Sequence, residues 1–263
     1  MSWHDLVEAD GLPVRESPLE SARFGLSFER VTVSAASDAP LSAVLTAVRR
    51  SEADIVVLRY PARHVEWFAA LTALGRTAVL ADSLVYWRLD AGKGRGPEPS
   101  PGLWAAGVTD PAVVREAVSA VFGSYGNHYL ANPLLDAGAA LEGYRDWALR
   151  SAAGGGCLGL YGEAPDGPGS RLLGLATVEE DDTRTEILLA GTVPGARGRG
   201  LYAHLLKGVE ERALARGAAE VVISTQGHNT GVQRAWARYG FEPVCTALTV
   251  HLVRCRLPRA PER

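Results

Sequence analysis

The sequence has 263 residues, enough for one large domain or two of ordinary size. Hydrophobic residues make up 47% and charged residues 22%, so the chain can form a core and disorder throughout is excluded. The formal net charge is −3 without a basic cluster, which argues against nucleic acid as a partner. Because no apolar run reaches the ~18 residues of a membrane span or resembles a signal peptide, we expect a cytoplasmic protein without a membrane contact.

Two further features of the composition are informative. Lys93 and Lys207 are the only lysines, and this Arg-rich, Ala-rich and Gly-rich composition is typical of a GC-rich bacterial genome. Cys157, Cys245 and Cys255 lack the spacing of metal ligands. We therefore expect reduced thiols and no metal site.

The first third of the chain predicts a small α/β layer. Short strands are expected at residues 31–33, 54–58 and 84–89, and helices at 41–49 and 65–74. The segment 91–102, AGKGRGPEPSPG, is rich in Gly and Pro and reads as a linker. The sequence thus predicts an N-terminal α/β domain over residues 1–96 and a second domain over 103–263.

The second domain shows a regular succession of expected elements. It begins with a strand near residues 103–108, two helices near 110–121 and 139–152, and three strands near 157–161, 171–178 and 185–193. An amphipathic helix at 201–216, a strand at 220–225, a helix at 230–239 and a last strand at 244–253 follow. This order again predicts an α/β fold.

The most informative segment is TEILLAGTVPGARGRGLYAH, residues 185–204. An apolar strand ends at Pro194, a loop of glycines and arginines follows, and an amphipathic helix begins at once. Such a loop directs backbone N–H groups and the positive end of a helix dipole at one point, and Arg197 and Arg199 add full charges. The segment therefore predicts a phosphate or pyrophosphate site.

Two other kinds of phosphate loop fit less well. A Walker-type loop needs Gly-Lys-Ser/Thr, which is absent from this sequence. The run from Gly198 to Ala203 fits the dinucleotide pattern G-x-G-x-x-A, but that interpretation requires an acidic residue after the next strand. Because that strand ends in Ser-Thr-Gln at residues 224–226, a nicotinamide-nucleotide-binding protein is the weaker alternative.

The loop is similar to the acyl-CoA loop of the GNAT N-acyltransferase superfamily, whose core is Arg/Gln-x-x-Gly-x-Gly/Ala. Arg197 and Gly200 match this core, whereas Tyr202 replaces its last small residue. The run 229–241, NTGVQRAWARYGF, is similar to the Asn-containing helix of that family. The resemblance implies a GNAT fold, with a mixed central sheet flanked by helices. It also implies acetyl-CoA or another acyl-CoA as co-substrate, bound by Val193, Arg197, Gly198, Arg199, Gly200, Leu201, Tyr202, Asn229 and Trp236.

The first domain has a looser resemblance. Ser21 to Gly25, Asp54 to Leu58 and Leu84 to Tyr86 resemble the N-terminal domain of dTDP-fucosamine acetyltransferase-like proteins. This resemblance implies a small-molecule amine acceptor, such as an amino sugar or a natural-product intermediate. It leaves a homodimer open.

Acyl transfer to an amine needs a proton acceptor, because an alkyl amine has a pKa near ~10. Glu186 lies eleven residues before Arg197, where one branch of the family carries a catalytic glutamate. His128 is the other candidate base, since it lies between the first two helices of the second domain, and His228 is a weaker candidate for a site role. His251 on the last strand is expected to be a core or lining residue. Backbone N–H groups near residues 191–193 are expected to stabilise the oxyanion.

The proton donor for the departing thiolate is missing from its usual place. Many relatives have a Tyr seven residues after the Asn, where this chain has Trp236. Tyr239 substitutes only if its helix is displaced and is otherwise a core residue. The replacement also supports a non-catalytic acyl-CoA-binding module as an alternative to an acyltransferase.

Overall fold

The computed structural model describes residues 3–163 and 169–255. Its described strands form a single ten-stranded sheet in the order β1-β2-β3-β10-β4-β9-β8-β7-β6-β5. The strands are β1 (Val14–Glu16), β2 (Phe28–Thr32), β3 (Ile55–Pro61), β4 (Arg76–Asp90), β5 (Leu103–Gly107), β6 (Cys157–Glu163), β7 (Ser170–Glu180), β8 (Arg184–Thr192), β9 (Glu220–Gln226) and β10 (Glu242–Arg254). The β2–β3 and β8–β9 pairs are parallel and the other pairs are antiparallel, so the sheet is mixed as predicted.

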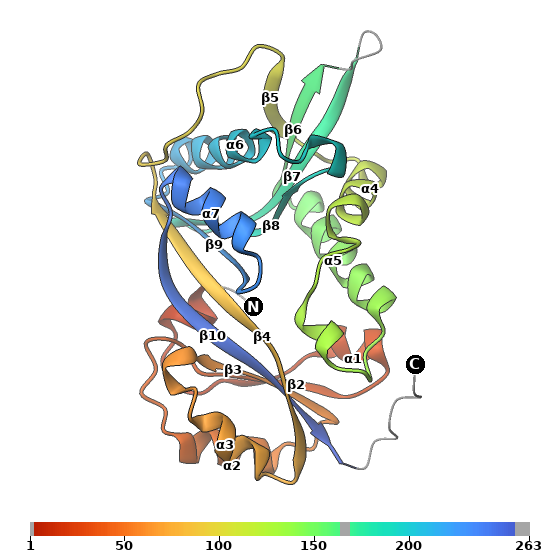
Figure 1. The fold of residues 1–263 in the computed structure, drawn as a ribbon, viewed down its shortest axis with the longest axis vertical. Helices are drawn as coiled ribbons and strands as arrows, with labels where there is room; N and C mark the ends of the chain where they lie inside the picture. The colour runs from red at the N-terminus through yellow and green to blue at the C-terminus, as the bar shows by residue number, and fades with distance from the viewer. Residues whose placement is uncertain (1–2, 164–168, 256–263) are drawn as a thin grey trace.

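Helices cover both faces of this sheet (Figure 1). The α-helices are α1 (Pro18–Phe24), α2 (Leu41–Arg50), α3 (Trp67–Thr72), α4 (Pro111–Phe122), α5 (Ala137–Ala153), α6 (Leu201–Ala215) and α7 (Thr230–Tyr239). Short helical turns are η1 (His4–Glu8), η2 (Ala62–His64), η3 (His128–Ala131) and η4 (Pro194–Ala196). One apolar cluster joins α6 and α7 to the sheet, a second joins α4 and α5 to its other face, and a third joins α2 and α3 to β2, β3 and β10.

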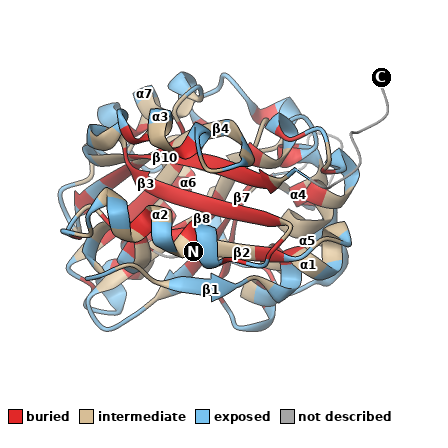
Figure 2. Cartoon of the chain, turned by 90° about the horizontal axis from the view of Figure 1, so that it is seen from below, coloured by how far each residue is buried: buried red, intermediate tan, exposed pale blue. Residues whose placement is uncertain are grey.

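Local sequence chemistry explains where the helices begin. The Asp110 carboxylate accepts a hydrogen bond from the Ala112 N–H at 2.8 Å, and Pro111 fits the first turn of α4. Asp136 caps α5 in the same manner through the Ala139 N–H at 2.7 Å. Buried residues concentrate in the central strands and exposed ones on the outer helices and loops (Figure 2).

The order of elements predicted after the linker is confirmed, and so is the α/β class. Before the linker, β4 is much longer than the expected strand, and η1, β1 and α1 are additional elements. The last strand, β10, lies between β3 and β4, with Val250 opposite both Leu58 and Leu80. The sheet is therefore continuous across the chain, and the limits 1–96 and 103–263 stay a prediction about domains.

A buried carboxylate holds the first part of the linker against α6 and α7. Glu210 Oε1 accepts hydrogen bonds from the N–H groups of Gly92 at 2.8 Å and Gly94 at 2.9 Å. Glu210 Oε2 accepts a hydrogen bond from the Tyr239 hydroxyl at 2.6 Å. Tyr239 is thus a core residue next to Phe241, with ring centroids 5.9 Å apart. The segment 92–94 is consequently fixed in place, although its composition indicates a linker.

We expect Glu210→Ala to lower the free energy of unfolding by roughly 3 kcal/mol, because it leaves three donors, the buried Tyr239 hydroxyl among them, without their charged acceptor. Glu211→Ala, on the exposed face of the same helix, is the matched control and should change stability by less than about 0.5 kcal/mol. Urea denaturation measures both values. Equal stability of the two variants would show that this carboxylate does not hold the linker.

Candidate active site

The centre of the site is a divergence between two parallel strands. β8 and β9 pair only over four residues, from Arg184 opposite Glu220 to Ile187 opposite Ile223. Beyond that point β8 continues along β7 as far as Thr192, while β9 continues along β4. One edge of each strand is therefore free of its neighbour, and a gap opens between them.

The divergence coincides with an irregularity in β8. Val178 lies opposite Ile187 and Thr177 lies opposite Leu189, so Leu188 is an extra residue that forms a β-bulge. Beyond the bulge the Val193 N–H donates to the Leu173 carbonyl at 3.0 Å. Because successive N–H groups in an antiparallel pair point to opposite sides, those of Ala190 and Thr192 point away from β7, toward the gap.

The Gly/Arg loop follows directly on this free edge. Gly198 and Gly200 adopt left-handed φ values of 74° and 75°, which favour glycine, and a Cβ at either position would meet no atom within 4 Å. Gly200 precedes α6 without a side-chain cap, so the first N–H groups of this helix are available to a ligand. Arg197 donates to the Val121 carbonyl at 3.2 Å, which ties the loop to α4.

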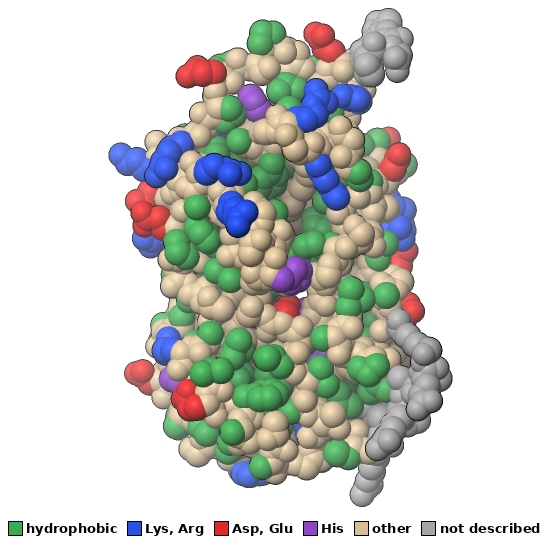
Figure 3. All heavy atoms as spheres, in the orientation of Figure 1, with side chains coloured by type: hydrophobic (Ala, Val, Ile, Leu, Met, Phe, Trp, Pro, Cys, Tyr) green, Lys and Arg blue, Asp and Glu red, His purple; other side chains and the backbone are tan. Residues whose placement is uncertain are grey.

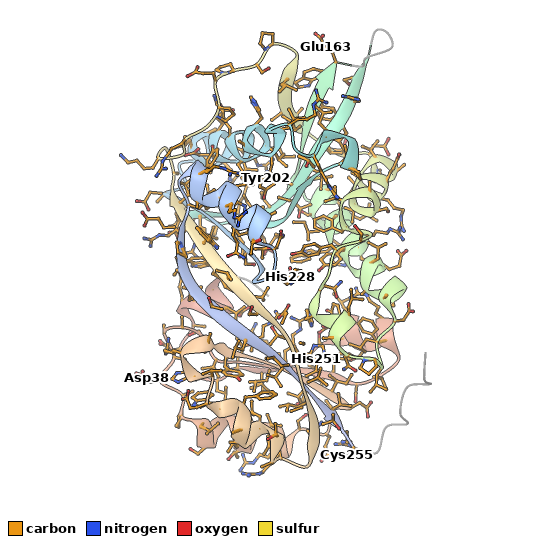
Figure 4. The ribbon with its side chains drawn as sticks, viewed as in Figure 1. Asp38, Glu163, Tyr202, His228, His251 and Cys255 are labelled. Atoms are coloured by element: carbon orange, nitrogen blue, oxygen red, sulfur yellow. The ribbon has the colours of Figure 1, made fainter. Side chains whose placement is uncertain are left out.

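The remaining residues implied for acyl-CoA lie on α6, on α7 or just before α7. Trp236 is buried, and its indole Nε1–H donates to the Tyr202 hydroxyl at 3.0 Å. Asn229 lies just before α7, and its side-chain amide donates to Thr225 Oγ1 at 3.0 Å. Tyr202 lies between α6 and α7 (Figure 4). The two positions where this sequence departs from the family pattern, Tyr202 and Trp236, therefore contact each other.

A cavity of about 1260 Å³ connects the loop to the N-terminal part of the chain. Its walls come from the loop and α6, from the segment between α4 and α5, and from α1, β2 and β3. Figure 3 shows the surface hollowed at the middle of this face. His228, after β9, projects toward this hollow (Figure 4). Of the implied acyl-CoA residues, those that line the cavity are Arg197, Gly198, Gly200, Leu201, Tyr202, Asn229 and Trp236. Val193 and Arg199 do not belong to the described lining of the cavity.

Glu186 does not belong to the described lining of the cavity. Both of its carboxylate oxygens accept a hydrogen bond from the Trp3 N–H, at 3.0 and 2.8 Å. Burial raises the pKa of this carboxyl to about 7, and the Trp3 hydrogen bond opposes that rise. Glu186 therefore has a pKa suited to a base near neutral pH, but it lies outside the described lining of the cavity.

His128, in contrast, is buried and lines the cavity. Its Nδ1 lies 2.9 Å from Nε2 of His251, whose Nδ1 lies 3.3 Å from the Asn132 amide. Burial and the nearby Arg59 charge lower the pKa of His128 well below 6.5 and that of His251 to about 4. Both imidazoles are therefore neutral at pH 7, and the same burial and charge make His128 a weak base.

The structure shows a further group of polar residues in the cavity wall, which the sequence did not reveal. The Glu20 carboxylate accepts hydrogen bonds from Arg30 Nε at 2.7 Å and from the Tyr129 hydroxyl at 2.5 Å, and these contacts lower the pKa of Glu20 to about 2 although burial opposes this. Arg59 is also buried there and donates to Thr249 Oγ1 at 3.1 Å. These residues come from separate elements, α1, β2, β3 and η3, so no short motif marks them.

Comparison with known proteins agrees with this geometry. Residues 128–241 match the model of the acetyltransferase (GNAT) family. A GCN5-related N-acetyltransferase from Sphaerobacter thermophilus superposes with a TM-score of 0.62 at 16% identity, over 92% of this chain and 76% of that one. A functionally unknown conserved protein from Staphylococcus epidermidis gives 0.60 at 11% identity, over 95% and 93%. A GCN5-related N-acetyltransferase from Kribbella flavida gives 0.52 at 18% identity, over 86% and 81%.

These findings identify the family of residues 128–241. Residues 128–241 form a GNAT acetyltransferase domain, and the fold is the GNAT fold. The family points to N-acetyltransferase activity. A search of curated proteins gives no match. Among the described residues, no helix has the length and apolar character needed to cross a membrane.

The raised pKa of Glu186 predicts a pH-dependent contribution to stability. Because its folded pKa of about 7 exceeds its usual value of 4.5, the folded protein binds an extra proton between these pH values. This stabilisation is complete below pH 4.5 and is lost as the pH rises through 7. At about 1.4 kcal/mol per pKa unit, Glu186→Gln should gain up to about 3 kcal/mol relative to the wild type between pH 4.5 and 8.

Chemical denaturation across this pH range measures the difference. Glu242→Gln is the control, because Glu242 lies on β10 and is exposed. The same pH dependence in both variants would contradict a buried, largely protonated Glu186.

Proposed function

We propose that this protein transfers an acetyl or another acyl group from acyl-CoA to the amine of a small molecule. The observation that carries the proposal is the divergence of β8 and β9 directly before the uncapped Gly/Arg loop. A thioester with a long pantetheine arm and a pyrophosphate needs an extended slot that ends in an anion site. The free edge of β8 followed by the first turn of α6 supplies both.

In this arrangement the pyrophosphate binds the N–H groups at the start of α6, with the Arg197 and Arg199 charges nearby. The thioester carbonyl accepts a hydrogen bond from an N–H group that β8 directs into the gap, at Ala190 or Thr192. Such a donor stabilises the oxyanion of the tetrahedral intermediate, typically by ~3 kcal/mol. The rigid sheet holds this donor in place before the substrate arrives.

The amine must lose a proton before or during attack. His128 lines the cavity, but its lowered pKa makes it a weak proton acceptor. Glu186, with a pKa of about 7, has the better basicity at neutral pH, but it lies outside the described lining of the cavity. We therefore keep both residues as candidate bases, His128 for its position and Glu186 for its pKa.

The acceptor is proposed to occupy the part of the cavity next to α1, β2 and β3. Its wall carries charged and hydrogen-bonding side chains, among them Glu20, Arg30, Arg59 and His128. Such a wall suits a polar acceptor that carries several hydroxyl groups, such as an amino sugar or a natural-product intermediate.

We expect acetyl-CoA to stabilise the protein and NAD to leave its melting temperature unchanged. Release of free CoA thiol from acetyl-CoA should depend on an added amine, and amino sugars are the first amines to test. Binding of acetyl-CoA without thiol release for any amine would favour the alternative of a non-catalytic acyl-CoA-binding module. Protection by NAD instead would favour a nicotinamide-nucleotide-binding protein.

Gly200→Ala should weaken acetyl-CoA binding at least ~10-fold, because the new methyl group enters the space proposed for the pyrophosphate. Gly217→Ala is a matched control, since Gly217 also has a left-handed φ of 79° and open space around its Cβ position, but follows the other end of α6. Both variants carry similar backbone strain, so calorimetric titration separates ligand binding from stability. Equal dissociation constants for the two variants would contradict the loop assignment.

A further inference from the structure

The departing sulfur of a thioester needs a proton, and six of the described tyrosines line the cavity. They are Tyr86, Tyr125, Tyr129, Tyr144, Tyr202 and Tyr239. A phenol is a donor only if its proton is not already engaged by a protein acceptor. The hydrogen bonds of the six hydroxyl groups therefore decide which of them serves the sulfur.

Three of these protons are engaged by protein groups. Tyr125 donates to Oε1 of Gln226. Tyr129 donates to the Glu20 carboxylate at 2.5 Å and Tyr239 to the Glu210 carboxylate at 2.6 Å. A phenol that already donates to a carboxylate would have to break a charge-assisted hydrogen bond before it served a substrate.

Tyr86 and Tyr144 pack against elements other than α6 and α7. Tyr86 is buried in the cluster that includes Trp3, on the face of the sheet opposite α6 and α7. Tyr144, on α5, stacks against Phe122 with ring centroids 5.3 Å apart. Neither belongs to the cluster that packs α6 and α7 onto the sheet.

Tyr202 differs from the other five tyrosines when the proton of its hydroxyl and its position beside the loop are considered together. It lies in the first turn of α6, two residues after Gly200, and lines the cavity. The indole N–H of Trp236 is only a donor, so the Tyr202 oxygen accepts this hydrogen bond at 3.0 Å and keeps its own proton. Among the described residues no acceptor takes that proton, which leaves it for a group in the cavity.

We propose that Tyr202 is the catalytic residue that protonates the departing CoA sulfur, and that Trp236 is the positioning residue that orients its hydroxyl. This inference rests on the proposed function. The amine nitrogen forms a bond to the thioester carbon, and the carbon–sulfur bond breaks with its electron pair on sulfur. The sulfur takes the Tyr202 proton to give free CoA thiol, and the tyrosinate recovers a proton from the one released by the amine.

The surroundings of the pair suit these roles. Burial raises the pKa of Tyr202, so the hydroxyl stays protonated throughout the neutral range. The Trp236 indole is 1% exposed and packs edge-on against Trp87, with ring centroids 6.1 Å apart. The position of the indole N–H that donates to Tyr202 is thus fixed by packing in the core.

Tyr202→Phe tests the proposal with the least change in shape. We expect kcat with acetyl-CoA and an accepted amine to fall ~10²-fold, which is typical for loss of a general acid. The dissociation constant of acetyl-CoA should stay within about twofold of the wild type. Because the phenol stays protonated, the ratio of wild-type to variant kcat should be constant between pH 6 and 9. Tyr161→Phe, on β6 and outside the described lining of the cavity, is the control and should keep wild-type kcat.

The positioning role has its own readout. Trp236→Phe should lower kcat in the wild-type background and should add no further loss to Tyr202→Phe, because its effect acts through the Tyr202 hydroxyl. Additive losses would show that Trp236 has only a structural role and would overturn this part of the proposal.

Three results would overturn the assignment of Tyr202. They are a fully active Tyr202→Phe, an equal loss in Tyr161→Phe, and a loss in Tyr202→Phe explained entirely by weaker acetyl-CoA binding. An active wild type with any of these results leaves the proposed function intact. A wild type that releases no thiol with any amine overturns the proposed function, and this inference with it.

Discussion

The divergence of β8 and β9 is the constraint on which the site depends. Paired parallel strands satisfy one another's backbone groups, so a strand that leaves its neighbour exposes donors that need a partner. Here the strands part after Ile187 and Ile223, and the bulge at Leu188 marks the same point. Each strand keeps its other neighbour, which makes the gap rigid. A ligand that pairs with the free edge of β8 completes the sheet locally, as an added strand would.

The N-terminal part of the chain extends this slot into a larger cavity. β10 lies between β3 and β4, so the two parts share one hydrogen-bonded sheet, and α1, β2 and β3 form the far wall of the cavity. The polar side chains of that wall are paired across elements, as in Glu20 with Arg30. Such pairing fixes the shape of the wall without a ligand. Specificity for the acceptor and binding of the donor are therefore assigned to different ends of one cavity.

Sequence reasoning reached the local features of this structure and missed the distant ones. The caps at Asp110 and Asp136, the turn of two left-handed glycines and the amphipathic α6 follow from neighbouring residues, so they were predictable. Candidate bases such as Glu186 were recognisable by residue type, but the contact of Glu186 with Trp3 joins residues 183 positions apart. The same limit applies to the hydrogen bond between Trp236 and Tyr202, because no local pattern indicates that these two side chains meet.

Hydrogen exchange with and without acetyl-CoA tests the central claim most directly, because it reports on the backbone N–H groups themselves. The account predicts that acetyl-CoA slows exchange in two segments, residues 188–192 on the free edge of β8 and residues 198–203 at the start of α6. The antiparallel segment of β10 against β3 should exchange at the same rate in both conditions and serves as an internal reference. Slower exchange in the loop alone, or at neither segment, would contradict the claim that the divergent strands and the glycine loop form one acyl-CoA site.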